Sequence, residues 1–526
     1  MRLSDAFDLS CRRKPSKPAL IFQGTKYSFQ GLKDKVDRLS AALVEMGVNL
    51  GDRVAILLSN CPQYIISYFA ITRIGAIIVP INNFLKGVEV QYILKDCDAI
   101  CLITSSDYLK NLNNLLPELK NLKHIILTDE GEEISPISRE KGSHISFYSF
   151  PQLMQKEPLR KVERSFAPDD LAVVIYTSGT TGFPKGAMLT HLNLISNAIS
   201  CLKAIKVVEK DRFILFLPLF HSFTQLVCMI LPIYNANTII LLPRIERKEL
   251  KKSILKYRPT IFIGIPSVYN VMANQKLSWL ARWLNPVRVY VSGAAPLSKK
   301  TFLKFSGNFR RPLLEGYGLS EASPVVCVNP LDGERKIGSV GLPIPGLEVK
   351  VVNQENKELP YDEVGELLVK GPNVMKGYYK RAEETKKTLR QCWLYTGDLA
   401  RIDEDGYIYI IDRKKDMLLY RGLNIYPREI EDVLYSHPTV DQAAVVGVQH
   451  PSRGEVPKAF VVLKEGFEIT ASELRHHCAE KLAGYKVPKL FQFVEQLPVS
   501  STGKVLKREL RRQLAEGIIP TKNHLE

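Results

Sequence analysis

A ten-residue stretch, TSGTTGFPKG at residues 177–186, holds the side chains best suited to binding a charged ligand. Its glycines let the backbone turn tightly and approach a ligand closely. Its donors to oxyanions are four hydroxyls and one cation, on Thr177, Ser178, Thr180, Thr181 and Lys185. This set favours polyphosphate binding over the alternative, a plain surface turn rich in Gly and Thr. It is not a Walker loop, because Lys185 precedes Gly186 rather than Ser or Thr.

The elements that must position this stretch alternate between strands and helices. Residues 171–176 (LAVVIY) are apolar and largely β-branched, which predicts a strand leading into the loop. An amphipathic helix is predicted at 64–75. Further apolar strands are predicted at 51–59, 76–82, 98–104, 123–129, 260–266 and 287–293. Strands separated by helices imply parallel sheets covered on both faces.

The pattern changes twice in the second half of the chain. Residues 335–411 hold short strands and turns, typical of a small, mainly antiparallel β subdomain. After the charged cluster at 413–416 the α/β pattern resumes. We therefore predict an α/β protein with a large N-terminal domain of stacked, mostly parallel sheets and helices, residues 1–414. A small, mobile α+β C-terminal domain would follow at residues 415–526.

Residues 213–243 contain no Asp, Glu, Lys or Arg, and are long enough in principle to span a bilayer. However, the segment is interrupted by Pro218 and by polar residues that include His221 and Asn235. Polar groups are costly at the centre of a bilayer. We favour a buried strand–helix–strand unit over a membrane span.

Composition is typical of a large intracellular protein. With 526 residues, 45% of them hydrophobic, the chain can build several domains with sizeable cores. Its nine cysteines are scattered without a zinc or disulfide pattern, which favours reduced thiols. The first residues lack the apolar core of a signal peptide. We expect a cytoplasmic protein.

The charge balance indicates acidic partners. Net charge is +17, and no acidic residue occurs between Glu249 and Glu315. Such a tract favours an anionic membrane, an acidic protein or a phosphate-rich cofactor; nucleic acid is less favoured, because no recognised binding module is present. Within the tract, Trp279 and Trp283 recur at helical spacing. A helix touching the inner face of a membrane fits this pattern, but we favour a core-facing helix, because Trp and Leu at helical spacing more commonly face a core.

Seven ordered motifs resemble those of the adenylate-forming superfamily, which includes acyl-CoA synthetases, peptide-synthetase adenylation domains and beetle luciferases. The resemblance covers the chain from about residue 18 to residue 514, and seven motifs in order are specific. They are TSGTTGFPKG, SGAAPLS (292–298), YGLSE (317–321), YTGD (395–398), DRKKD (412–416), GLNIYPREIE (422–431) and PVSSTGKVLKREL (498–510). Ser320 stands where the family usually has Thr.

The resemblance implies an AMP-binding adenylation domain at 1–414 and a C-terminal lid domain at 415–526. It implies a phosphate loop made of Thr177, Ser178, Gly179, Thr180, Thr181, Gly182 and Lys185. It also implies a loop next to the adenine of ATP, made of Gly293, Ala294, Ala295 and Pro296. Tyr317 would offer adenine a flat face, next to Gly318 and Ser320. Asp398 and Arg413 would bind the ribose. Glu321 and Thr177 would hold Mg²⁺, which prefers oxygen ligands.

The implied reaction makes an acyl-adenylate from a carboxylate and ATP, then transfers the acyl group to a thiol. Lys504 is the first catalytic candidate, since a cation there can bridge the carboxylate and the α-phosphate; Lys185 is the second. Closing the C-terminal domain about a hinge at Lys415 would deliver Lys504 and exclude water. In the other state, Gly422 would line a channel for pantetheine.

The substrates are only partly indicated. His221 aligns with the acyl pocket as a gate or wall, or is a satisfied core histidine. The uncharged segment 213–243 favours a medium- or long-chain fatty acid over an amino acid. The thiol acceptor is coenzyme A or the phosphopantetheine of an acidic acyl carrier protein. Alternatives are a luciferase-like or other acyl-adenylate enzyme, or a basic lipid-binding protein without catalysis.

Overall fold

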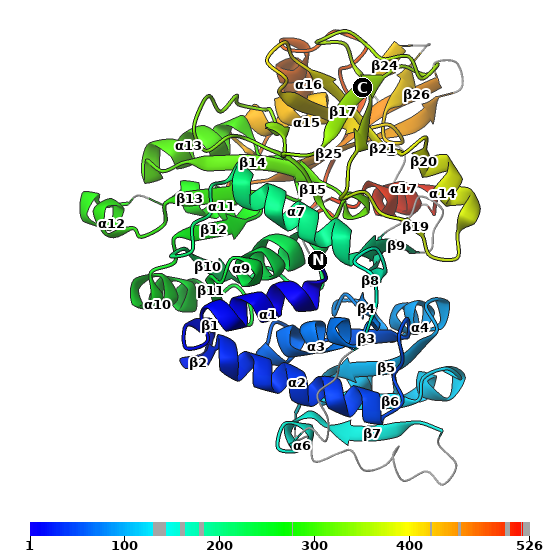
Figure 1. The fold of residues 1–526 in the computed structure, drawn as a ribbon. Coiled ribbons are helices and arrows are strands. Elements are labelled where there is room, and N and C mark those ends of the chain that lie inside the picture. Colours follow the sequence, from blue (N-terminus) through cyan, green and yellow to red (C-terminus); the bar gives the residue numbers. More distant parts are fainter. Residues whose placement is uncertain are drawn as a thin grey trace.

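The computed structural model describes residues 1–129, 144–157, 164–177, 184–275, 277–420, 423–450, 454–499, 505–516 and 518. It confirms the predicted α/β class (Figure 1). The helices of this described part are α1 (Leu3–Arg13), α2 (Phe29–Glu45), α3 (Pro62–Arg73), α4 (Gly87–Asp96), α5 (Ser106–Lys110), η1 (Asn113–Glu118), α6 (Phe150–Leu153), α7 (His191–Ala204), α8 (Ser222–Thr224), η2 (Gln225–Ile230), α9 (Leu231–Tyr234), α10 (Arg247–Tyr257), α11 (Pro266–Ala273), α12 (Trp279–Leu284), α13 (Lys299–Phe309), η3 (Ser320–Ala322), α14 (Ala382–Thr388), α15 (Pro427–Ser436), α16 (Ala471–Ala479) and α17 (Lys507–Ala515).

Two large sheets form the N-terminal part, and both are mostly parallel, as predicted. The first, in spatial order, is β16 (Leu342–Pro343), β15 (Val325–Val328), β14 (Leu313–Gly318), β13 (Val289–Ser292), β12 (Ile261–Gly264), β10 (Arg212–Leu215), β11 (Thr238–Leu241), β1 (Pro18–Phe22) and β2 (Thr25–Ser28). The second is β19 (Gly377–Tyr378), β9 (Lys185–Thr190), β8 (Leu171–Thr177), β4 (Ile77–Pro80), β3 (Arg53–Leu57), β5 (Ala99–Thr104), β6 (His124–Leu127) and β7 (Ser146–Ser149). Antiparallel strands occur at the edges of both sheets.

One hydrophobic core is shared by the two large sheets and the helices between them. It includes Ile56 of β3, Phe213 of β10 and Phe69 of α3. The contacting helix pairs α2·α3, α1·α3 and α1·α9 lie within this core. Because both sheets are anchored to one core, the loops at their carboxyl ends are held at fixed positions relative to each other.

Two smaller sheets complete the fold. The antiparallel strands predicted within 335–411 are β17 (Glu348–Val352), β18 (Gly365–Lys370), β21 (Trp393–Ile402), β20 (Leu389–Arg390) and β22 (Ile408–Arg413). The C-terminal sheet contains β24 (Leu423–Ile425), β23 (Leu418–Tyr420), β26 (Gly454–Leu463), β25 (Val440–His450) and β27 (Leu490–Phe493), with α15 and α16 packed on it at the top of Figure 1. The domain limits at 414 and 415 remain a prediction.

The uncharged segment is the buried unit that the sequence predicted. It runs through β10, α8, η2, α9 and β11, and every residue of η2 is buried. Among the described residues, no helix combines the length and the apolar character needed to cross a membrane.

Helix α12 differs from one of the two interpretations of its sequence. None of its residues is buried, and the side chains of Trp279 and Trp283 are 78% and 74% exposed. The core-facing interpretation is therefore wrong. The reason is that α12 is a short helix projecting at the edge of the molecule (Figure 1, left), and no other element in the described part of the chain buries it.

Candidate active site

The phosphate-loop stretch begins and ends on two paired strands. Thr177, the last residue of β8, is the register partner of Lys185, the first residue of β9. This pairing places a hydroxyl and an ammonium group at the base of the loop. The candidates Ser178, Gly179, Thr180, Thr181 and Gly182 lie outside the described residues.

The structure brings Thr177 and Glu321 together, as predicted for the metal site. The Thr177 Oγ1 hydroxyl donates to Glu321 Oε1 over 3.5 Å. The Tyr378 hydroxyl donates to the same oxygen over 2.9 Å. Tyr378 reaches Glu321 because β19 pairs with β9, with Tyr378 opposite Ala187. Burial, followed by the charge of Glu321, raises the pKa of Tyr378, so its hydroxyl remains a donor.

Lys185 lies beside this carboxylate cluster. Its side chain is 12% exposed, and its Nζ lies 3.7 Å from Glu384 Oε1 and 5.6 Å from the centre of the Tyr378 ring. A lysine with this limited freedom can present its charge to an anion bound at the loop.

A second cluster surrounds Asp398, whose side chain is 3% exposed. Arg413 Nε lies 2.6 Å from Asp398 Oδ1, and the Tyr317 hydroxyl donates to Asp398 Oδ2. Residues 398 and 413 are partners across β21 and β22, so a hairpin aligns this ion pair. The charge of Asp398 raises the pKa of Arg413, and that of Glu321 contributes, which indicates that the two clusters are neighbours.

The loop after β13 packs against the segment that follows β10. A Cβ on Gly293 would lie 2.8 Å from Cζ of Phe223, so any larger residue there would displace that ring. Ala294 adopts a φ of +69°, in the left-handed region that favours glycine. Ala294 and Pro296 are exposed and Ala295 is half-buried, so the loop is open to a ligand.

His221 and Ser320 border the same region. His221 caps α8, with its Nδ1 accepting a hydrogen bond from the Phe223 amide over 3.3 Å. The hydroxyl of Ser222 lies 3.0 Å from that of Ser320. A Cβ on Gly318 would lie 2.1 Å from the carbonyl oxygen of Pro324, so this glycine is required by its own backbone surroundings.

The resemblance noted in the sequence can now be compared with known proteins. The AMP-binding enzyme family matches residues 7–379, and its separate C-terminal domain matches residues 429–504. The chain belongs to the AMP-binding enzyme family.

Two curated relatives in this family are long-chain-fatty-acid–CoA ligases. The one from Bacillus subtilis (strain 168) is 37% identical, covering 96% of this chain and 93% of the relative. The one from Escherichia coli O6:H1 is 36% identical, covering 99% and 96%. Among solved structures, ATP-bound MatB from Rhodopseudomonas palustris matches with a TM-score of 0.88 and 29% identity, over 98% of this chain and 99% of that one.

The oxygen donors in the described site fit the Mg²⁺ that accompanies ATP in this family. Glu321 and Thr177 provide a carboxylate and a hydroxyl within 3.5 Å of each other. Mg²⁺ is usually held by one or two such groups together with phosphate oxygens and waters, rather than by a complete protein cage.

Two residues of the site were missed by the sequence reasoning. Tyr378 and Glu384 come from β19 and α14, far along the chain from Glu321 and Lys185. Within GYYKRAEET, residues 377–385, nothing in the residue types points to either group. Only the pairing of β19 with β9 reveals the connection.

One contact near the predicted hinge crosses the predicted domain limit, between Arg428 and Asp412, and a second lies on its C-terminal side, between Arg511 and Asp416. The Arg428 amide donates to Asp412 Oδ2 over 2.8 Å, and Arg511 Nη2 lies 2.8 Å from Asp416 Oδ1. Burial lowers the pKa of Lys415 between these contacts. Lys504 and Gly422 lie outside the described residues.

Proposed function

We propose that this chain is an AMP-forming ligase that joins a long-chain fatty acid to coenzyme A. The observation that carries the proposal is that the Tyr317 hydroxyl contacts Asp398 of the Asp398–Arg413 pair, while Glu321, four residues after Tyr317, belongs to the Thr177–Glu321–Lys185 cluster. One cluster suits a ribose and the other a polyphosphate. The near full-length relatives named long-chain-fatty-acid–CoA ligases support the choice of acid and thiol.

The residues of the two clusters divide the work of binding ATP. Asp398 retains lone pairs for the ribose hydroxyls, and Tyr317 presents its ring to adenine while its hydroxyl is held by Asp398. Lys185 binds phosphate oxygens. Glu321 and Thr177 would hold Mg²⁺, which neutralises phosphate charge when bound.

In the first step, a carboxylate oxygen of the fatty acid forms a bond to the α-phosphorus of ATP. The bond from that phosphorus to the bridging oxygen breaks, and pyrophosphate leaves. Lys504 would stabilise the charge that develops between the two reactants. In the second step, the thiol sulfur loses its proton and bonds to the acyl carbon, and AMP leaves.

The wall of the uncharged segment supports an alkyl chain as substrate. Phe216, Leu217 and Phe220 follow β10 and are nearly fully buried, and no acidic side chain in 213–243 is available to hold an amino group. Each methylene transferred from water to such surroundings contributes about 0.8 kcal/mol.

Release of pyrophosphate with ATP, Mg²⁺ and fatty acids of increasing length tests the proposal. We expect release that depends on the acid and loss of it in Lys504→Ala. That variant should still convert supplied acyl-adenylate to thioester, because Lys504 acts on the first step. Release without any fatty acid, or full activity in Lys504→Ala, would refute the proposal. Thioester formed with an acyl carrier protein but not with coenzyme A would replace the proposed acceptor.

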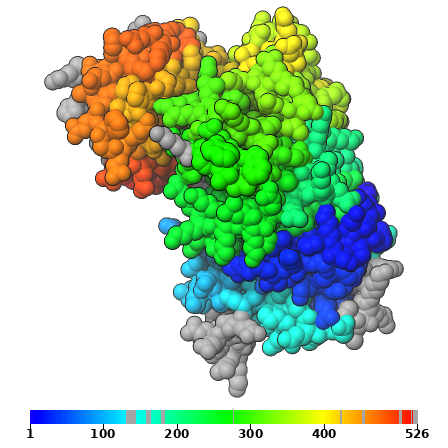
Figure 2. Space-filling view, turned by 90° about the vertical axis from the view of Figure 1, so that its left-hand side faces the viewer, coloured from blue at the N-terminus to red at the C-terminus, as the bar shows by residue number. Residues whose placement is uncertain are grey.

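We further propose that the enzyme contacts an anionic membrane through α12. Its exposed Trp279 and Trp283 are flanked by a basic face, defined as the exposed cations of α10 and α13 and of the residues just after each helix. They are Arg247, Lys248, Lys251, Lys252, Lys256, Arg258, Lys299, Lys300, Lys304, Arg310 and Arg311. In Figure 2, where this side faces the viewer, green residues of this part of the chain cover the centre. Interfacial tryptophans with surrounding cations are typical of peripheral membrane binding.

Co-sedimentation with vesicles tests this contact. We expect the protein to bind vesicles containing phosphatidylglycerol more strongly than pure phosphatidylcholine. The double variant Trp279→Ala, Trp283→Ala should bind at least tenfold more weakly, whereas Tyr361→Ala, which removes an aromatic side chain of similar exposure elsewhere, should bind normally. Equal binding by the double variant would exclude α12 as the contact.

A further inference from the structure

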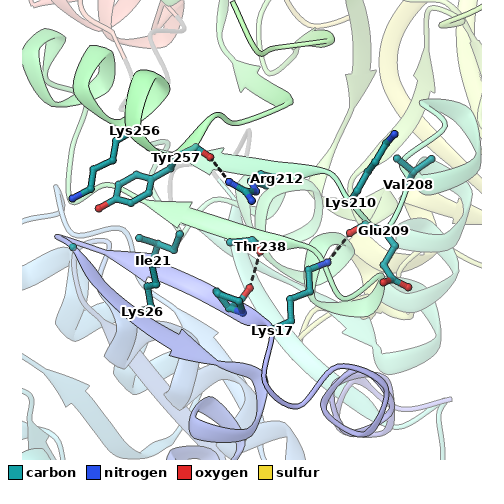
Figure 3. A pocket seen from close by; sticks show the side chains of 12 residues that line it. Lys17, Ile21, Lys26, Val208, Glu209, Lys210, Arg212, Thr238, Lys256 and Tyr257 are labelled. Carbon is teal, nitrogen blue, oxygen red and sulfur yellow. Dashed lines mark hydrogen bonds between the residues drawn. The ribbon is translucent and has the colours of Figure 1, made fainter.

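A surface cavity of about 1030 Å³ lies away from the candidate active site (Figure 3). It is lined by the β1–β2 hairpin, by the first residues of β10 and β11, and by the end of α10. Strands β1, β10 and β11 run parallel to β12, β13 and β14. The cavity therefore includes the amino ends of β10 and β11, whereas Gly293 follows the carboxyl end of β13 and Tyr317 lies near the carboxyl end of β14.

Cationic side chains dominate the lining of this cavity. They are Lys17, Lys26, Lys210, Arg212 and Lys256, which come from three separate segments of the chain. The carboxylate in the lining, Glu209, is already paired with Arg13 at 3.0 Å and with Lys14 at 2.8 Å. The cavity is therefore strongly positive, and its like charges repel one another unless an anion binds between them.

Two of the cations are fixed in place by the backbone. Lys17 Nζ donates to the carbonyl oxygens of Glu209 and Ala236, each over 2.7 Å. Arg212 Nη1 donates to the carbonyl oxygen of Tyr257 over 2.9 Å, and Figure 3 draws this bond at one side of the hollow. An arginine held in this way can offer its remaining N–H groups to two oxygens of one phosphate.

The other three cations are Lys26, Lys210 and Lys256, which line the same cavity. All three are exposed, and within the described ranges of the chain none of them pairs with a carboxylate. Ile21, Pro18 and the ring of Tyr257 add an apolar part to the lining. This combination suits an organic phosphate better than a bare inorganic ion.

We propose that this cavity is a binding site for a phosphate ester, with Arg212 as the oriented donor and Lys26, Lys210 and Lys256 as surrounding charges. Two sources share that chemistry: a soluble phosphomonoester and the headgroup of a phospholipid. The site is independent of the proposed ligase reaction, because none of its residues belongs to the candidate active site.

The test uses the full chain and a triple variant, Lys26→Gln, Lys210→Gln, Lys256→Gln. Its matched control is Lys251→Gln, Lys357→Gln, Lys387→Gln, which removes three exposed lysines outside the cavity; Lys251, like Lys256, belongs to the basic face of α10, so both variants lose one charge from that face. Glycerol 3-phosphate is titrated by calorimetry. Co-sedimentation uses phosphatidylcholine vesicles that contain a minor fraction of phosphatidic acid. In this assay every protein also carries Trp279→Ala and Trp283→Ala, so that the tryptophans of α12 do not contribute to vesicle binding.

We expect the triple variant to bind at least one of the two probes tenfold or more weakly than the control variant does. Loss confined to glycerol 3-phosphate identifies a soluble ligand, and loss confined to vesicles identifies a lipid headgroup. Equal binding by both variants, or binding of neither probe by the unaltered chain, overturns the proposal. Pyrophosphate release should be unchanged in both variants, which separates this result from a failure of the ligase assignment. Should the triple variant not fold, the single change Arg212→Gln provides the same comparison.

Discussion

Replacing Tyr378 by Phe removes one hydroxyl group and tests whether that group positions Glu321 for Mg²⁺. The Tyr378 hydroxyl donates to Glu321 Oε1 over 2.9 Å, while the Thr177 hydroxyl is at the outer limit of hydrogen bonding, at 3.5 Å. A hydrogen bond to a charged group contributes about 1.5–3 kcal/mol. Glu321 is only half-buried, so we take the lower end, about 1.5 kcal/mol.

That free energy corresponds to about a tenfold change in an equilibrium constant. We therefore expect Tyr378→Phe to raise the Mg²⁺ concentration for half-maximal pyrophosphate release by about tenfold at a fixed ATP concentration. The maximal rate at saturating Mg²⁺ should change far less, because the carboxylate itself is retained.

The adjacent residue supplies the control. Tyr379 is also half-buried, its ring contacts Lys380, and its hydroxyl donates no hydrogen bond within the part of the chain that the structure describes. Tyr379→Phe should leave the Mg²⁺ requirement unchanged. The reasoning is refuted if Tyr378→Phe needs no more Mg²⁺ than the unaltered enzyme, or if Tyr379→Phe shifts the requirement equally.

Three further predictions concern other parts of the site. Gly293→Ala should raise the KM for fatty acid several-fold, because its Cβ would lie 2.8 Å from Phe223, and adding Phe223→Leu should reverse the effect. Asp398→Asn should raise the KM for ATP at least tenfold, since Arg413 and the ribose both lose a charged acceptor; an unchanged KM would contradict the assigned role. Burial raises the pKa of Glu315 to about 7. Between the lower pKa of the unfolded chain and pH 7, the folded protein therefore binds one proton more than the unfolded chain does. The free energy of unfolding consequently falls as pH rises through this range. The unfolding midpoint of Glu315→Gln minus that of the unaltered protein should therefore increase as the pH is raised from about 5 to about 8. The total increase should correspond to at most about 3 kcal/mol. A difference that does not change with pH would contradict this prediction.

The local parts of the site were predictable from the sequence. Thr177 and Lys185 are eight residues apart at the two ends of one loop, so their shared role in binding an anion was predicted, although the strand β9 that pairs them was not. The alternation of apolar strands and amphipathic helices likewise predicted the two mostly parallel sheets. Both signals are short in range, and side-chain periodicity records them directly.

Contacts between distant segments were not predictable in the same way. The motifs suggested that Asp398 and Arg413 serve one sugar, but their ion pair depends on the register of β21 and β22. The favoured core-facing interpretation of Trp279 and Trp283 was wrong, because helical spacing tells which residues share a face and not whether that face is covered.

The sequence by itself determined the fold class, the phosphate-loop chemistry and the membership of the adenylate-forming superfamily, because these are written in ordered local motifs. Only the tertiary structure decided that Tyr378 binds Glu321 and that three separate segments place five cations on the lining of one cavity. The physical reason is that strand pairing and packing in a shared core bring together residues whose separation along the chain carries no signal of contact.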